Sequence, residues 1–354
     1  MEYRAEPHVR SDLASTRRDA AVFLDSIPVR DISGPIARQN WIARWTKTGD
    51  AHCRLAGLKV KKGALDEATE AWLCALTAFE VARRLTDEGD LQIGDVPAKL
   101  EAGFQRVTSL LEQKVQIVNI ACDETEVLGY YLRASSHHSP SPAVICISSE
   151  QETGAMLLGR LLPAVIGRSM SVLVISHEEV SRHSRGRSEI LLSYCLDFLS
   201  VRAEVDATRI GVYGDGVSAI LATDLAASDR RVAAAVCDGG LWNCTKTLAS
   251  VGWMTRAANV MDRDVASARR SQSSRQLRCP VLVVAGGRGI VSVLEAIKLQ
   301  ADCVAARMDI ELVMPRMIRV PEHEIENFVA FDDCIFKWFE QKLARGSALS
   351  TTVG

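Results

Sequence analysis

The chain has 354 residues, of which 47% are hydrophobic and 24% charged, with a net charge of −2 and a pI near 6.4. This composition is typical of a globular protein, and the length predicts one large domain with a smaller one. The balanced charge argues against nucleic acid or an anionic membrane as partner. No apolar run reaches the roughly 18 to 20 residues that span a bilayer.

The ten cysteines are scattered, and several lie within apolar runs, as Cys146 and Cys237 do. We expect reduced thiols in the core, because no Cys-x-x-Cys pair is present. The start of the chain lacks a basic-then-apolar leader, so the sequence predicts a cytoplasmic location. Since no cluster has the spacing of a metal site, we expect neither a metal nor another cofactor.

Helical periodicity dominates residues 1–112, which we interpret as an N-terminal helical module. Apolar side chains recur there at steps of three and four residues in two sets: Leu65, Ala68, Trp72, Leu76 and Phe79, then Leu100, Phe104, Val107 and Leu111.

Residues 113–345 alternate β-rich runs with amphipathic segments, which predicts a mostly parallel sheet covered on both faces. Within this domain, residues 239–278 become helical again, as expected of a lid inserted after a strand. The tail, residues 346–354, is small and polar and is predicted to be flexible. The eight predicted strands are residues 115–120, 127–132, 143–147, 171–175, 210–213, 232–237, 281–285 and 310–314.

The stretch from Arg209 to Ala219 has the pattern of a strand, a sharp turn and a helix. In a nucleophile elbow, Gly-x-Nu-x-Gly, only very small residues fit two positions either side of the nucleophile. With Gly214 and Ser218 at those flanks, Gly216 takes the nucleophile position. The shifted alternative makes Asp215 the nucleophile, but it places large side chains at both crowded flanks, so the first register is favoured.

The chain resembles the α/β-hydrolases related to 2,6-dihydroxypseudooxynicotine hydrolase, the fermentation-respiration switch protein and fungal pigment chain-shortening hydrolases. The resemblance rests on the strand pair Val115 to Arg133, on Val205-Asp-Ala-Thr-Arg-Ile-Gly211 before the elbow, and on Cys279-Pro-Val-Leu-Val-Val-Ala285. It implies an α/β-hydrolase fold from about Trp41 onward, a small-molecule substrate of aromatic or polyketide type, and a homodimer formed through the helical module.

The resemblance also implies a Ser-Asp-His triad, which is degenerate here. The serine position is Gly216, and the acid loop, Gly286-Gly-Arg-Gly-Ile-Val291, has Arg288 at the acid position. The histidine position is filled by His323. It is either a working base or a remnant of ancestry, because without its acid partner nothing obvious fixes its tautomer.

Two loops that carry backbone glycines in the family carry polar side chains here: Ser148 to Thr153 and Ser176 to Val180. Glu150, His177 and Glu178 would lie at the C-terminal edge of the sheet, where α/β proteins bind ligands. Together with Gly216 and Val217 of the turn, they could line a substrate pocket. Solvated loop positions are the alternative.

Trp242 and Trp253 of the lid could wall an apolar pocket, although helical spacing also suits core positions. Asp215 could cap the helix after the turn or act as a general base, and Asp238 at the end of its strand has the same two possible roles. Ser218 is expected to face the strand behind it rather than act as a nucleophile.

Three functions follow. The first is an enzyme of small-molecule, secondary metabolism that uses His323 with Asp215 or Asp238 for acid–base chemistry of lyase, cyclase or C–C cleavage type. The second is a pseudohydrolase that binds a small molecule or a protein without turnover. The third, an esterase using Asp215, lacks a visible acid to support the histidine.

Overall fold

A computed structural model describes residues 12–28, 34–86, 96–111, 115–123, 125–135, 140–182, 185–239, 277–285, 309–314, 317–319 and 324–344, and a few single residues between 32 and 304. The expected lid, apart from its two ends, and the expected tail lie outside the described residues.

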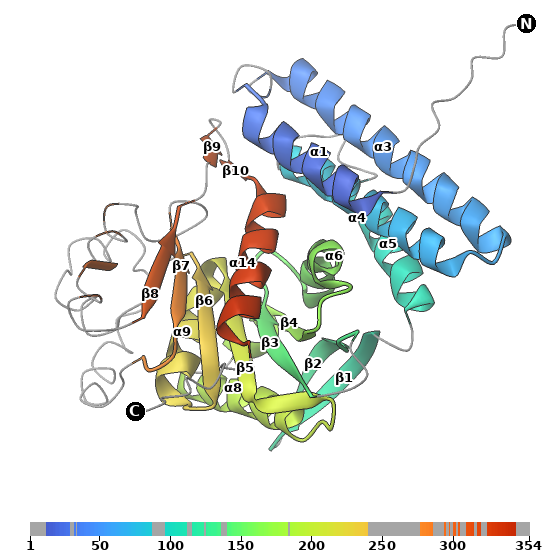
Figure 1. Ribbon diagram of the computed structural model, residues 1–354. Coiled ribbons are helices and arrows are strands. Elements are labelled where there is room, and N and C mark those ends of the chain that lie inside the picture. Colours follow the sequence, from blue (N-terminus) through green and yellow to red (C-terminus); the bar gives the residue numbers. More distant parts are fainter. Residues whose placement is uncertain are drawn as a thin grey trace, which may run out of the picture.

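Helices fill the N-terminal part of the chain (Figure 1). Asp12 caps the first of them by accepting a hydrogen bond from the Ser15 N–H. The two longest of these helices, those that contain Gly49 and Phe79, pack closely, because Gly49 has no side chain and leaves room for the ring of Phe79. The helices are α1 (Leu13–Ser26), α3 (Pro35–Lys61), α4 (Leu65–Leu85) and α5 (Val96–Leu110).

An eight-stranded sheet follows, in the order β1-β2-β4-β3-β5-β6-β7-β8. Strand β2 runs antiparallel to both of its neighbours, and the other pairs are parallel. All eight predicted strands are confirmed, although the fifth begins five residues earlier than expected. The strands are β1 (Val115–Cys122), β2 (Thr125–Leu132), β3 (Ser141–Ile147), β4 (Ser171–Ile175), β5 (Val205–Asp215), β6 (Val232–Asp238), β7 (Val281–Val284) and β8 (Ile310–Val313).

Helices cover both faces of the sheet, so that the central strands are buried on both sides. One face packs against α8 (Arg185–Ser200) and α9 (Ala219–Ser228). The other face packs against α6 (Gly154–Val165) and α14 (Phe328–Lys342), and the N-terminal helices α4 and α5 lie against α6. The helical part therefore contacts α6, and Phe104 of α5 also packs directly against Tyr130 of β2.

A short hairpin, which the sequence did not predict, precedes α14. Its strands are β9 (Met317–Arg319) and β10 (Glu324–Glu326). Ile318 and Ile325 pack with Leu24 and Leu85 of the N-terminal helices. The hairpin thus joins the end of the chain to the helical part.

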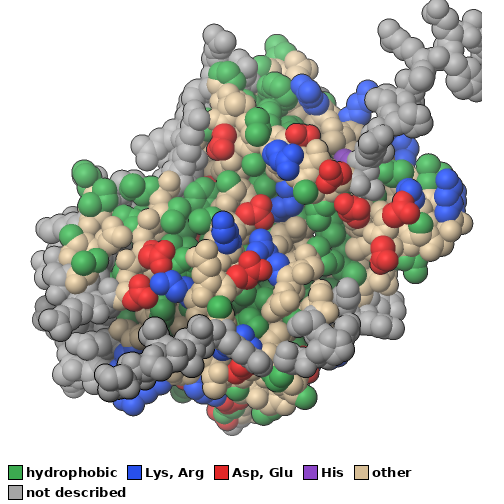
Figure 2. Space-filling model, viewed as in Figure 1, with side chains coloured by type: hydrophobic (Ala, Val, Ile, Leu, Met, Phe, Trp, Pro, Cys, Tyr) green, Lys and Arg blue, Asp and Glu red, His purple; other side chains and the backbone are tan. Residues whose placement is uncertain are grey.

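On the face shown in Figure 2, acidic and basic side chains are interspersed. Several form surface ion pairs, such as Arg168 with Glu340 and Lys342 with Asp309. Within the described part of the chain, no helix is both long and apolar enough to cross a bilayer. The eight described cysteines are free thiols, and five of them, including Cys146 and Cys237, are buried.

Candidate functional site

The turn after β5 has the geometry of a nucleophile elbow. The strand ends at Asp215, a 3-10 turn covers Gly216–Ser218, and α9 begins at Ala219. Gly216 has φ +60°, in the left-handed region that L side chains rarely adopt. A Cβ at Gly214 would lie 2.2 Å from the Ser218 carbonyl oxygen. This close approach fits the register with Gly214 and Ser218 at the flanks and Gly216 at the nucleophile position.

The carboxylate of Glu150 occupies the space beside that position. Glu150 lies in the loop after β3, and its Oε2 is 3.1 Å from where a Cβ on residue 216 would be. The same oxygen accepts a hydrogen bond of 3.4 Å from the Val217 N–H. In a hydrolase elbow, the N–H after the nucleophile belongs to the oxyanion hole. Here that donor binds a carboxylate of the protein itself.

His177 and Ser218 form a second polar pair at this edge of the sheet. The Nδ1 of His177 is 2.8 Å from the Ser218 Oγ, and that hydroxyl donates to the Ser148 carbonyl at 2.6 Å. The His177 N–H donates to the Ser148 Oγ. Burial lowers the pKa of His177, and the nearby Glu150 carboxylate opposes that shift. Ser218, fully buried, therefore faces the β3 loop and His177.

Beneath the turn, a buried layer surrounds Arg160, which projects from α6. Its guanidinium donates to Asp215 Oδ2 at 2.9 Å and to the Tyr213 hydroxyl at 3.0 Å. That hydroxyl in turn donates to Asp238 Oδ2 at 3.2 Å. Of the two roles considered for Asp215, helix capping is not seen, because its side chain makes no capping hydrogen bond to the turn. The Asp215 carboxylate forms an ion pair with the buried Arg160 guanidinium instead.

This layer extends into what we call the buried charge cluster, which joins α4, α6, β5, β6, β10 and α14. Glu152 links the N-terminal helices to Arg160: it accepts from Arg83 at 2.6 Å and lies 3.7 Å from the Arg160 guanidinium. Within the part of the chain that the structure describes, six carboxyl groups lie around the guanidinium groups of Arg83, Arg84 and Arg160, and Arg17 also acts on Asp332. The cluster comprises Glu80, Glu152, Asp215, Asp238, Glu326 and Asp332 with Arg83, Arg84 and Arg160.

The pKa values divide the carboxyl groups into two kinds. Burial raises the pKa of Asp215 to about 6 and that of Asp332 to about 7, although Arg160 opposes both shifts. Burial, together with Glu326 and Asp215, raises the pKa of Asp238 well above its usual range. Burial would also raise the pKa of Glu80, but Arg83 and Arg84 lower it to about 2. The cluster therefore holds both protons and ion pairs at neutral pH.

The structure thus brings Glu150, His177, Gly216 and Val217 together at one edge, with Asp215 and Asp238 in the layer below. His323, Trp242, Trp253 and Arg288 lie outside the described residues. Sequence reasoning missed Arg160 and Glu152. A single arginine within the apolar helix Gly154–Val165 was the available signal, because such a buried cation requires a partner.

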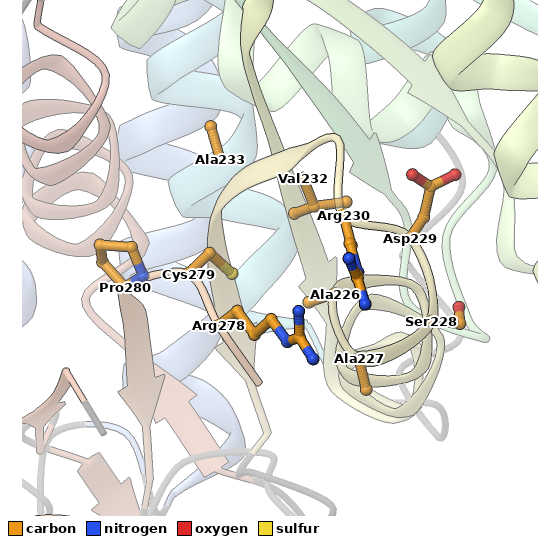
Figure 3. Close-up of a pocket in the computed structure, with 10 residues that line it drawn as sticks. All are labelled: Ala226, Ala227, Ser228, Asp229, Arg230, Val232, Ala233, Arg278, Cys279 and Pro280. Carbon is orange, nitrogen blue, oxygen red and sulfur yellow. The ribbon is translucent and has the colours of Figure 1, made fainter. Parts of the chain in front are cut away.

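Two cavities lie away from the elbow. One, of about 520 Å³, is at the opposite end of the strands, between the end of α9 and the starts of β6 and β7, with Arg230 and Arg278 at its wall (Figure 3). The other, of about 560 Å³, is in the helical part around Phe23, Trp41 and Trp45. No group of three or more potential metal ligands occurs among the residues that the structure describes.

No protein-family model matches the chain, and no curated protein is similar to it in sequence. Among solved structures, the 2,6-dihydroxy-pseudo-oxynicotine hydrolase has a TM-score of 0.56 and 18% identity, over 92% of this chain and 95% of that chain. The acylaminoacyl peptidase of Pyrococcus horikoshii has a TM-score of 0.48 and 11% identity, over 68% of this chain and 44% of that one. The AtxE2 isopeptidase has a TM-score of 0.46 and 18% identity, over 65% of this chain and 40% of that one.

The strand order, the elbow and the first of these similarities define the class: the chain has the α/β-hydrolase fold with an N-terminal helical module. The similarity to the 2,6-dihydroxy-pseudo-oxynicotine hydrolase extends over nearly the full length of both chains. At this identity the similarity extends to the fold and not to the chemistry.

Proposed function

We propose that this protein binds a small molecule above Gly216 and acts on it by non-covalent acid–base chemistry of lyase, cyclase or C–C cleavage type, as part of small-molecule, secondary metabolism. One observation carries the proposal. The nucleophile position has no side chain, and the Glu150 carboxylate fills the adjoining space while it binds the Val217 N–H.

This arrangement disfavours an acyl-enzyme mechanism. Such a mechanism requires an exposed nucleophile and vacant N–H donors for the developing oxyanion. Asp215 is 2% exposed and paired with Arg160, so esterase chemistry through this residue is not supported. Ser218 is fully buried and its hydroxyl already donates to Ser148. Neither residue presents itself to a substrate.

Proton transfer needs no covalent nucleophile. The sequence offers His323 as the base, and Asp238 as a carboxyl group whose raised pKa would let it donate a proton near neutral pH. The proposal includes a cytoplasmic location and a homodimer, the latter on the family resemblance alone.

The second candidate is a pseudohydrolase that binds a ligand and releases it unchanged. The hydrogen bond between Glu150 and the Val217 N–H favours this candidate as well. The N–H that would bind a developing oxyanion is already bound to a carboxylate of the protein. A ligand that copurifies with the protein and is recovered unchanged after long incubation would support this candidate over the enzyme.

The charge of Glu150 gives a test that needs no knowledge of the substrate. Benzylamine and benzoate share a ring and carry opposite charges. A carboxylate about 4 Å away attracts the first and repels the second by about 1 to 4 kcal/mol each, so their binding energies differ by about 2 to 8 kcal/mol. We expect calorimetry to show benzylamine binding about tenfold or more tightly than benzoate. Glu150→Gln should remove this preference.

Glu178→Gln is the matched control, because Glu178 lies at the same edge but is exposed and paired with Arg182. This variant should keep the preference for benzylamine. Tighter binding of benzoate to the wild type, or an unchanged preference in Glu150→Gln, would contradict a site organised by Glu150.

A further inference from the structure

The Ser218 hydroxyl group has a single hydrogen and two close partners. The Ser148 carbonyl oxygen, 2.6 Å away, can only accept a hydrogen bond, so the hydroxyl hydrogen is directed to it. The second partner, His177 Nδ1 at 2.8 Å, must then donate to the Ser218 Oγ. This fixes the proton of a neutral His177 ring on Nδ1 and leaves the lone pair on Nε2.

Three further contacts hold this arrangement. Ser148 Oγ donates to the Glu152 carbonyl at 2.6 Å and accepts from the His177 N–H at 3.0 Å. Ser148 and Ser218 are both fully buried, so water does not compete for these bonds. His177 also begins the short helix α7 (His177–Ser181), which Ser176 caps by accepting a hydrogen bond from the Glu179 N–H. Both the backbone and the ring of His177 are therefore fixed.

We infer that His177 is a general base of the elbow site, with Nε2 as its proton acceptor and Ser218 as the positioning residue that sets its tautomer. The inference rests on the proposed function and deepens it, because it names a base within the described residues. In the step, the N–H bond to Nε2 forms while a substrate O–H or N–H bond breaks, and the electron pair stays on the substrate atom. The nearby Glu150 carboxylate then stabilises the imidazolium.

The same geometry indicates the substrate class. Glu150 places negative charge beside His177 and already binds the Val217 N–H. A carboxylate ligand would be repelled and would find this donor occupied. The pair therefore suits a neutral or cationic molecule that presents a polarised hydroxyl or amine hydrogen.

The tautomer can be measured directly on the substrate-free protein. In a long-range ¹H–¹⁵N correlation spectrum near neutral pH, assigned by comparison with His177→Gln, wild-type His177 should show a protonated Nδ1 and an unprotonated Nε2. In Ser218→Ala the Nδ1–H signature should be lost in favour of the Nε2–H form, which free imidazole side chains prefer.

Ser149→Ala is the matched control, because it shortens the neighbouring buried serine, whose Oγ has no hydrogen-bond partner among the described residues. It should leave the His177 signals unchanged. An Nε2–H tautomer or an imidazolium in the wild type would overturn the inference, and so would an unchanged tautomer in Ser218→Ala. If Ser218→Ala fails to fold, the wild-type spectrum alone decides.

Failure of the proposed function has a different signature. In that case neither benzylamine nor benzoate would bind above Gly216, while His177 would still show the Nδ1–H tautomer.

Discussion

Replacing Arg160 by methionine is expected to lower the free energy of unfolding at neutral pH by about 3 to 5 kcal/mol. Methionine matches the volume of the arginine stem but removes the cation that Asp215, Glu152 and Asp332 share. Asp215 would then remain buried without its guanidinium partner, whereas Glu152 would keep Arg83 and Arg84. Denaturant unfolding followed by circular dichroism measures the change.

Arg168→Met is the control for Arg160→Met. Arg168 follows the same helix, but its main partners, Glu340 and Asp333, are 41% and 46% exposed. Exposed pairs contribute about 0 to 1 kcal/mol, so this variant should remain within about 1 kcal/mol of the wild type. If both variants lost the same small amount of unfolding free energy, Arg160 would not be the stabilising cation of the buried charge cluster.

The free energy of unfolding is expected to fall as pH rises from about 5 to about 8. Asp215 and Asp332 have folded-state pKa values of about 6 and about 7, above the usual 3.8. The folded protein therefore holds more protons than the unfolded chain between about pH 4 and 7, and the stability from these protons is lost as pH rises through the folded pKa values. Glu80 acts in the opposite sense, because its pKa of about 2 gives stability that is lost only in acid.

Asp332→Asn tests whether Asp332 contributes to this pH dependence, because the substitution keeps the shape of the side chain and removes its titration. Thermal unfolding at several pH values should show a flatter decline, with a gain of about 1 to 3 kcal/mol over the wild type near pH 8. Asp333→Asn, at the next, half-exposed position of the same helix, should keep the wild-type pH dependence. Stability that rises steadily from pH 5 to pH 8 in the wild type would contradict the assignment.

Much of the fold could be predicted because the signals are local. Runs rich in β-branched residues, such as Val281–Val284, predict strands, and all eight predicted runs are strands of the one large sheet. Hairpin strands β9 and β10 were missed, because three residues each give too little pattern. The elbow register followed from the steric demands at Gly214, which the backbone geometry reproduces.

The candidate site could be predicted only in part, because its contacts join distant residues. The sequence placed Glu150 and His177 at the correct edge of the sheet. It could not show that Glu150 would bind the Val217 N–H, or that the Ser218 hydroxyl would face His177. The buried charge cluster joins residues from Glu80 to Asp332, so no local pattern reveals it. Only the single charge of Arg160 within an otherwise apolar helix indicated that partners were required.

The central claim, that this hydrolase elbow has no covalent nucleophile, is tested most directly by labelling with a fluorophosphonate probe. Intact-mass measurement after incubation should find the protein unmodified, under conditions in which an active serine hydrolase of the same fold is labelled completely. One probe adduct per chain, mapped to Ser218 or to any other serine, would contradict the claim.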